Sequence, residues 1–100
     1  MATESQLRDT ALRLRVRERI EDGRLPVMVP DRILAGYGSG RVCVACDQPI
    51  MSTQVQYELD DYRDGKRLSF HLGCHVAWQI ECARARAAGD ERQQPDSGGL

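Results

Sequence analysis

Four side chains with metal-binding chemistry occur as two pairs, and two residues separate the members of each pair. Cys43 and Cys46 form the first pair, and His71 and Cys74 form the second. Structural zinc sites use four thiolate or imidazole ligands in a tetrahedron, and the ligands commonly come in closely spaced pairs. A Cys-x2-Cys pair can form a tight knuckle, and a His-x2-Cys pair on a first helical turn presents both side chains on one face. The sequence therefore predicts one structural Zn²⁺ ion per chain.

Two further side chains could compete for this ion. His75 lies four residues after His71, so it would replace His71 if the helix began earlier. Cys82 lies two helical turns beyond Cys74, about 12 Å along the axis, and is expected to be a small buried residue instead. Trp78 is expected in the core or as a cover over the site. Four cysteines also allow two disulfides, but a histidine at matching spacing favours metal binding.

The segment between the two pairs has to bring them together. Apolar residues alternate over 54–59 and 68–70, and the polar stretch between these runs ends in Asp64-Gly65, which predicts a β-hairpin. On the first run Val55, Tyr57 and Leu59 are expected to face one way, and Gln54, Gln56 and Glu58 the other. The period then becomes helical until Gly89. We therefore expect a small α+β zinc-stabilised domain over residues 41–89, built from a knuckle, a hairpin and a C-terminal helix.

The remaining segments flank this domain. Residues 5–22 are typical of an amphipathic helix within an N-terminal segment 1–24, with Ser5 as its cap and Gly23 as its stop. Its apolar positions form two neighbouring stripes, Leu7, Ala11 and Leu14 on one and Leu12, Val16 and Ile20 on the other. Residues 25–40 hold two prolines and three glycines, which favours an extended strap with one helical turn from Asp31. Residues 90–100 have the composition of a disordered tail.

Composition limits the classes of protein to which this chain can belong. One hundred residues allow one small core, and 14 basic against 15 acidic residues disfavour a protein that coats a polyanion. No apolar run approaches the roughly 18 residues of a membrane span, and the polar start lacks the pattern of a signal peptide. A cytoplasmic protein is therefore expected. Arginine supplies every basic residue except Lys66, which is typical of GC-rich coding and favours a bacterial source.

These motifs resemble known zinc modules. Cys43-x2-Cys46 followed by His71-x2-Cys74, with Trp78 on the next helix, is similar to a treble-clef zinc finger and in particular to the first half of a LIM domain. A LIM domain would continue with a second zinc module, whereas a helix and a tail follow here. The chain also resembles short uncharacterised proteobacterial zinc-finger-like proteins, through the motifs Gly23-Arg-Leu-Pro26, Gly36-Tyr-Gly-Ser-Gly40 and Tyr57-Glu58. The resemblance implies a fold and a metal, and it implies no activity.

Two functions from different classes fit the sequence. Four ligands close the coordination sphere and no acid–base motif accompanies them, so we expect the protein not to be an enzyme. The first hypothesis is a protein-interaction or regulatory module that uses the apolar face of residues 7–20 to contact a protein partner or a second copy. The alternative is a DNA- or RNA-binding regulator that uses the arginines of the same helix, namely Arg13, Arg15, Arg17 and Arg19. Interleaved acidic residues and the net charge of −1 weaken this alternative.

Overall fold

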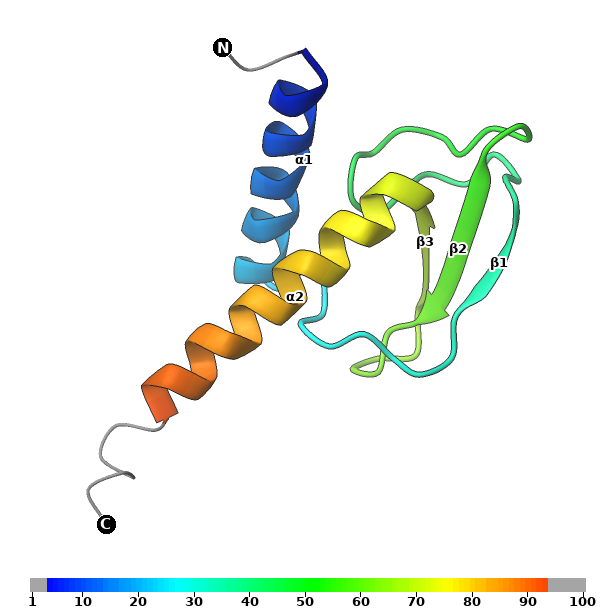
Figure 1. Cartoon of the computed structure of the whole chain (residues 1–100). Coiled ribbons are helices and arrows are strands. Elements are labelled where there is room, and N and C mark those ends of the chain that lie inside the picture. Colours follow the sequence, from blue (N-terminus) through cyan, green and yellow to red (C-terminus); the bar gives the residue numbers. More distant parts are fainter. Residues whose placement is uncertain (1–3, 94–100) are drawn as a thin grey trace.

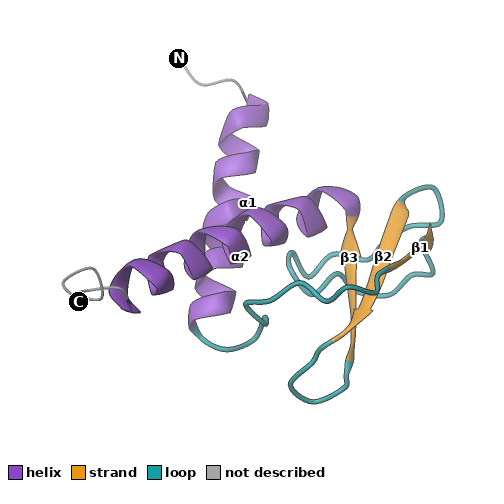
Figure 2. Ribbon diagram, turned by 60° about the horizontal axis from the view of Figure 1, so that its bottom comes forward, coloured by secondary structure: helices purple, strands orange, loops and turns teal. Residues whose placement is uncertain are grey.

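The computed structural model describes residues 4–93, which form two helices and one three-stranded sheet (Figure 1). The elements in chain order are α1 (Glu4–Glu21), β1 (Leu34–Tyr37), β2 (Val55–Asp60), β3 (Arg67–His71) and α2 (Leu72–Gln93). The sheet is antiparallel with the order β1-β2-β3. The two helices cross each other, and the sheet stands beside the end at which α2 begins (Figures 1 and 2). The α+β class predicted from the sequence is confirmed.

The hairpin predicted between the two ligand pairs is confirmed. β2 and β3 pair in a register that places Tyr57 opposite Phe70 and Leu59 opposite Leu68. Gly65 adopts a left-handed conformation with φ of 77° in the turn, where a residue without Cβ is favoured. Leu59 and Phe70 are buried in the core. The hairpin therefore returns the chain to the knuckle, where β3 ends at His71.

A short loop before the hairpin holds the first ligand pair. Val42 and Pro49 form an isolated antiparallel bridge that closes this loop. The Val44 N–H donates to the Ser69 carbonyl at 2.9 Å, which attaches the loop to the outer edge of β3. The first ligand pair is thus fixed against the strand that leads to the second pair.

The segment between α1 and the loop differs from the expected strap. Leu34–Tyr37 is a strand, and the helical turn expected from Asp31 is wrong. Gly38 follows the strand at a place where a Cβ atom would collide with the carbonyl oxygens of Met51 and Ile50. Glycine and proline lower the strand propensity of this segment, and pairing with β2 is what makes part of it a strand.

Helix α1 begins one residue before Ser5, so Ser5 lies within the helix and the predicted cap is wrong. The predicted stop is confirmed, because Gly23 has φ of 85° and the Leu25 N–H donates to the Arg19 carbonyl at 3.0 Å. This bond closes the last turn in the manner of a C-terminal capping motif. The chain then turns back so that Leu25 and Pro26 are buried.

Of the two predicted apolar stripes of α1, the one that contains Leu12, Val16 and Ile20 packs inside the molecule, and the side chain of Leu7 on the other stripe lies outside the described part. Val16 is fully buried, and Leu12 and Ile20 pack against the core beside it. Leu14, on the other stripe, is 47% exposed. Part of the surface expected to contact a partner is therefore used to pack α1 within the chain itself.

Helix α2 also has one buried and one exposed side. Trp78 is fully buried, stacks on Phe70 with ring centroids 5.0 Å apart, and donates its Nε1–H to the Pro26 carbonyl at 2.9 Å. The expected end at Gly89 is wrong, because the helix continues to Gln93. The rest of the predicted tail, residues 94–100, lies outside the described residues. No helix in residues 4–93 combines the length and the apolar character that a membrane span requires.

Candidate metal centre

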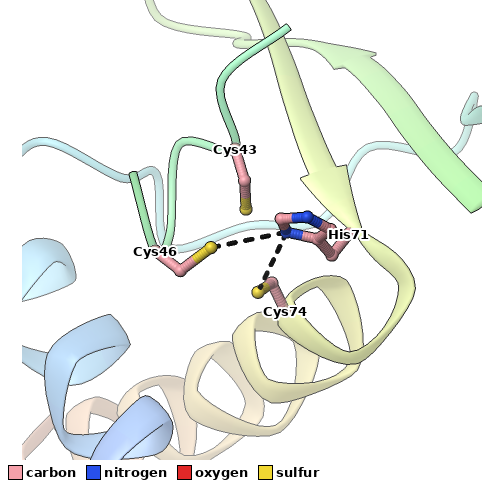
Figure 3. Close-up of side chains that lie close together, drawn as sticks. All are labelled: Cys43, Cys46, His71 and Cys74. Carbon is pink, nitrogen blue, oxygen red and sulfur yellow. Dashed lines mark hydrogen bonds between the residues drawn. The ribbon is translucent and has the colours of Figure 1, made fainter. Parts of the chain in front are cut away.

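The structure brings the four predicted ligands into one cluster. The ligand atoms of Cys43, Cys46, His71 and Cys74 all lie within 4.8 Å of one another (Figure 3). His71 Nδ1 lies 3.4 Å from Cys46 Sγ and 3.8 Å from Cys74 Sγ. A tetrahedral ion with Zn–S bonds of about 2.3 Å and Zn–N bonds of about 2.1 Å would separate nitrogen from sulfur by about 3.6 Å. The cluster therefore has the dimensions of a tetrahedral metal site.

The backbone of the loop explains how two cysteines three positions apart face the same point. The Cys43 N–H donates to the Gln48 carbonyl, and the Asp47 N–H donates to the Cys43 carbonyl, both at 2.9 Å. Asp47 has φ of 64°, a left-handed conformation that aspartate accepts more readily than most residues. The chain therefore reverses directly after Cys46, and this tight turn forms the predicted knuckle (Figure 3).

Hydrogen bonds distribute charge unequally among the sulfurs. The Cys74 thiol donates to the Cys43 sulfur, as do the backbone N–H groups of His71, Cys46 and Ala45, and together they lower the pKa of Cys43 to about 4. The same bond raises the pKa of Cys74, since that thiol is the donor. Burial raises the pKa of Cys46. One sulfur is thus stabilised as a thiolate, which is the form that binds a metal ion.

The imidazole ring of His71 is oriented by a second contact outside the cluster. Its Nε2–H donates to the Pro49 carbonyl at 3.1 Å, and a carbonyl can only accept. This tautomer leaves the lone pair on Nδ1, the nitrogen that lies among the sulfurs. Metal-binding histidines commonly have such a partner on the other ring nitrogen. The structure therefore places His71 ready to act as a ligand through Nδ1.

The two competing ligand candidates lie outside the cluster. His75 is buried, and its ring stacks on Tyr57 with centroids 4.8 Å apart; burial lowers the pKa of His75. Its Nε2 has no hydrogen-bond partner among the described residues. Cys82 is buried and donates its thiol to the Pro26 carbonyl at 3.6 Å, and burial raises the pKa of Cys82 to about 11. All four cysteines are free thiols, so the disulfide alternative is not formed.

Two arginines of α1 hold the knuckle from outside. Arg19 Nη1 donates to the Val44 carbonyl at 2.6 Å, and the two Nη atoms of Arg19 bond both carboxylate oxygens of Asp47 at 3.1 and 2.5 Å. The Asp47 partner raises the pKa of Arg19, and Arg19 lowers the pKa of Asp47. Arg15 Nη1 donates to the Cys46 carbonyl at 3.2 Å. Arg15 and Arg19 are thus bound to the backbone and side chains that shape the turn carrying Cys43 and Cys46.

The other two arginines face α2. Arg13 Nε and Arg17 Nε donate to the two oxygens of Glu81 at 3.0 and 2.9 Å, and the Glu81 side chain is only 1% exposed. Spacing of four residues puts Arg13 and Arg17 on one face of α1 and Arg15 and Arg19 on another. The sequence shows that spacing, but not what each face meets. The partners of these four arginines could therefore not be predicted from the sequence.

No family model, curated protein or solved structure matches this chain. The assignment of a function therefore rests on the cluster, on the elements that hold it and on the charged groups around it.

Proposed function

We propose that the protein binds one Zn²⁺ ion through Cys43, Cys46, His71 and Cys74, and that this ion is structural. The supporting observation is a Cys3His cluster in which all four ligand atoms lie within 4.8 Å. Thiolate and imidazole ligands favour zinc over magnesium or calcium. Four protein ligands complete a tetrahedron and leave no position for a reactive water, so the centre is not that of an enzyme.

We further propose that the chain is a treble-clef zinc finger, related to the first half of a LIM domain. The order of the elements supports this. A knuckle supplies Cys43 and Cys46, a β-hairpin follows, and Cys74 comes from the first turn of the helix after the hairpin. Zinc contributes about 10–16 kcal/mol to the folding of small zinc-finger peptides near neutral pH, which is comparable to the whole stability of a small domain. The ion would therefore decide whether residues 41–89 fold.

The biological role that we propose is a protein-interaction or regulatory module. Apolar side chains left exposed on the helices support it; they are Leu14 on α1 and Leu72, Val76 and Ile80 on α2. The nucleic-acid alternative is less well supported, because Arg13, Arg15, Arg17 and Arg19 have partners within the chain. A nucleic-acid binding assay at two salt concentrations separates these roles, since phosphate contacts weaken steeply as salt rises.

The experiment that tests the zinc proposal measures metal content and folding on the same samples. The purified full chain is analysed for zinc by mass spectrometry, and the ion is then replaced by Co²⁺ to observe sulfur-to-cobalt charge-transfer absorption. We expect one ion per chain and an absorption spectrum typical of tetrahedral thiolate coordination. Excess chelator is expected to abolish the cooperative thermal transition followed by circular dichroism. An unchanged melt in chelator would contradict a structural ion.

A matched pair of cysteine variants separates metal binding from burial. Cys74→Ser removes a proposed ligand and is expected to lose the metal and the fold of residues 41–89. Cys82→Ser changes a cysteine of similar burial outside the cluster, and it is expected to lower stability modestly and keep one metal per chain. Equal metal loss in both variants would show that the effect comes from damage to the core and not from a ligand.

A further inference from the structure

Strand β1 is an outer strand of the sheet, and no other strand of residues 4–93 pairs with its second edge (Figure 1). All four residues of β1 are uncharged and exposed, and Tyr37 at its end is 83% exposed. An exposed edge that lacks lysine and proline is a ready template for a further strand. We propose that this edge pairs with the same edge of a second copy of the chain. The surface is separate from the apolar side chains that the helices leave exposed.

The backbone of β1 directs two residues toward the free edge. The Gly38 N–H donates to the Gln54 carbonyl at 2.9 Å, and the register of β1 on β2 places these two residues opposite each other. Bonded and non-bonded pairs alternate along an antiparallel ladder. Ala35 and Tyr37 therefore belong to non-bonded pairs, so their N–H and C=O groups point away from β2. These groups have no partner within the described part of the chain.

A twofold axis beside Gly36 would satisfy all of these outward groups. In that antiparallel pairing Ala35 of one copy lies opposite Tyr37 of the other, and each such pair exchanges both N–H···O bonds. The side chains then match in size, because each Tyr37 ring lies beside a small Ala35 side chain. On the other face Gly36 meets Gly36 of the second copy, where a glycine leaves open space. The edge is therefore complementary to itself.

Charged residues on both sides of β1 favour a second copy over an unrelated strand. Asp31 and Arg41 each lie five residues from Gly36, one before it and one after it. Both are exposed, and neither side chain has a hydrogen bond or an ion pair to another described residue. An antiparallel pairing about Gly36 brings Asp31 of each copy to the same end as Arg41 of the other. The two copies are thus complementary in charge.

The opposite edge of the sheet limits the assembly to two copies. The Val44 N–H donates to the Ser69 carbonyl on β3, so the knuckle occupies part of that edge. A strand of four residues is also much shorter than the roughly 20–30 residues that each partner contributes to a standard interface. Small interfaces are typical of reversible contacts. We therefore expect a dimer that forms as the protein concentration rises.

Sedimentation equilibrium of the metal-loaded full chain measures the dissociation constant of this dimer, and hydrogen exchange reports on the Ala35 and Tyr37 amides. We expect both amides to exchange more slowly at high protein concentration. Ala35→Pro removes an outward N–H without removing a bond to β2, and it is expected to raise the dissociation constant about tenfold. Ala35→Ser keeps this N–H and is the matched control, with an expected change of less than about twofold.

Two charge variants identify the partner as a second copy. Asp31→Arg and Arg41→Asp each bring like charges together at both ends of the contact, so each variant alone is expected to associate severalfold more weakly. A mixture of the two variants restores opposite charges at both ends, and a heterodimer as tight as the wild-type dimer is expected. Arg86→Asp, at an exposed position of α2, is the control and is expected to leave association unchanged.

A chain that stays monomeric at every concentration would overturn the proposal. A dimer that survives Ala35→Pro would also overturn it, because such a dimer uses another surface, and so would assemblies larger than two. Binding of an extended peptide to a monomeric chain would assign the edge to a different partner. Circular dichroism and zinc content are measured for each variant, so lost association is distinguished from lost metal or fold. If Ala35→Pro does not fold, the mixture of charge variants decides.

Discussion

Replacing Glu81 and its arginine partners separately tests how α1 is held on α2. The Glu81 side chain is 1% exposed, whereas Arg13 and Arg17 are 44% and 34% exposed. Glu81→Gln removes the buried charge and leaves two arginines that water can reach. The double variant Arg13→Met/Arg17→Met keeps the length of both side chains but leaves a buried carboxylate with only Arg84, 3.8 Å away.

The two perturbations should differ in size because the burial of the partners differs. Removing the partners of a buried charge typically costs about 3–5 kcal/mol, since the charge stays in a poorly solvated place. Losing a hydrogen bond to a charged group, while the replaced side chain keeps its shape, costs about 1.5–3 kcal/mol. We therefore expect the double arginine variant to be less stable than Glu81→Gln by about 2 kcal/mol. This is a large part of the stability of a small domain.

Urea unfolding of the metal-loaded protein measures these differences directly. Trp78 is the only tryptophan of the chain and is fully buried, so its fluorescence reports on the packing of α2. Linear extrapolation gives the free energy of unfolding of each variant. Arg86→Met, at an exposed position of α2, is the control and is expected to change stability by less than about 0.5 kcal/mol.

The relative stability of the two variants decides whether the argument from unequal burial holds. If Glu81→Gln costs as much as the double arginine variant, the argument from unequal burial is wrong. If neither variant differs from the control, the Glu81 contacts do not hold α1 on α2 at all.

Three further predictions concern single positions. Gly38→Ala is expected to lower the free energy of unfolding measured in urea by about 1–3 kcal/mol, because a Cβ atom there collides with backbone carbonyls. Gly36→Ala is the control, since a Cβ atom at that position meets nothing within 4 Å. The pKa of Asp61 is lowered by its hydrogen bonds from Arg63, so its stabilising effect is present above its ordinary pKa and lost as pH falls through the lowered value. The difference in Tm between the wild type and Asp61→Asn should therefore be largest near neutral pH and disappear in acid; a difference independent of pH would contradict this. Asp47→Val should lower Tm more than Asp47→Asn, because a β-branched residue resists φ of 64° while asparagine accepts it.

The ligand set, the hairpin and both helices could be predicted because each depends on nearby residues. The spacing of Cys43 and Cys46 fits one tight turn, and the spacing of His71 and Cys74 fits one face of a helix. The change from alternating to helical periodicity at His71 marks where β3 ends and α2 begins. The choice of His71 over His75 needed the structure, because a one-turn shift of the helix start would have reversed it. The cluster itself therefore follows from sequence, and its imidazole ligand does so only in part.

Features that depend on distant residues could not be predicted. β1 exists because it pairs with β2, whereas its own glycine and the proline four residues before it argue against a strand. Gln56 was expected on the polar face but is buried, because Ser39 donates its N–H and its hydroxyl to the Gln56 side-chain oxygen, both at 3.1 Å. The acceptors of the four arginines depend on how α1 lies against α2 and against the knuckle, which no local pattern encodes.

The Pro26 carbonyl limits how far the chain can be shortened toward the residues that carry the cluster. It receives both the Trp78 indole N–H and the Cys82 thiol, and it belongs to the segment that α1 leads into. A fragment that starts at residue 41 would retain every cluster ligand, but it would lose the acceptor of the Trp78 indole N–H and the arginine partners of Glu81. The shortest piece with its native internal partners therefore includes the N-terminal helix.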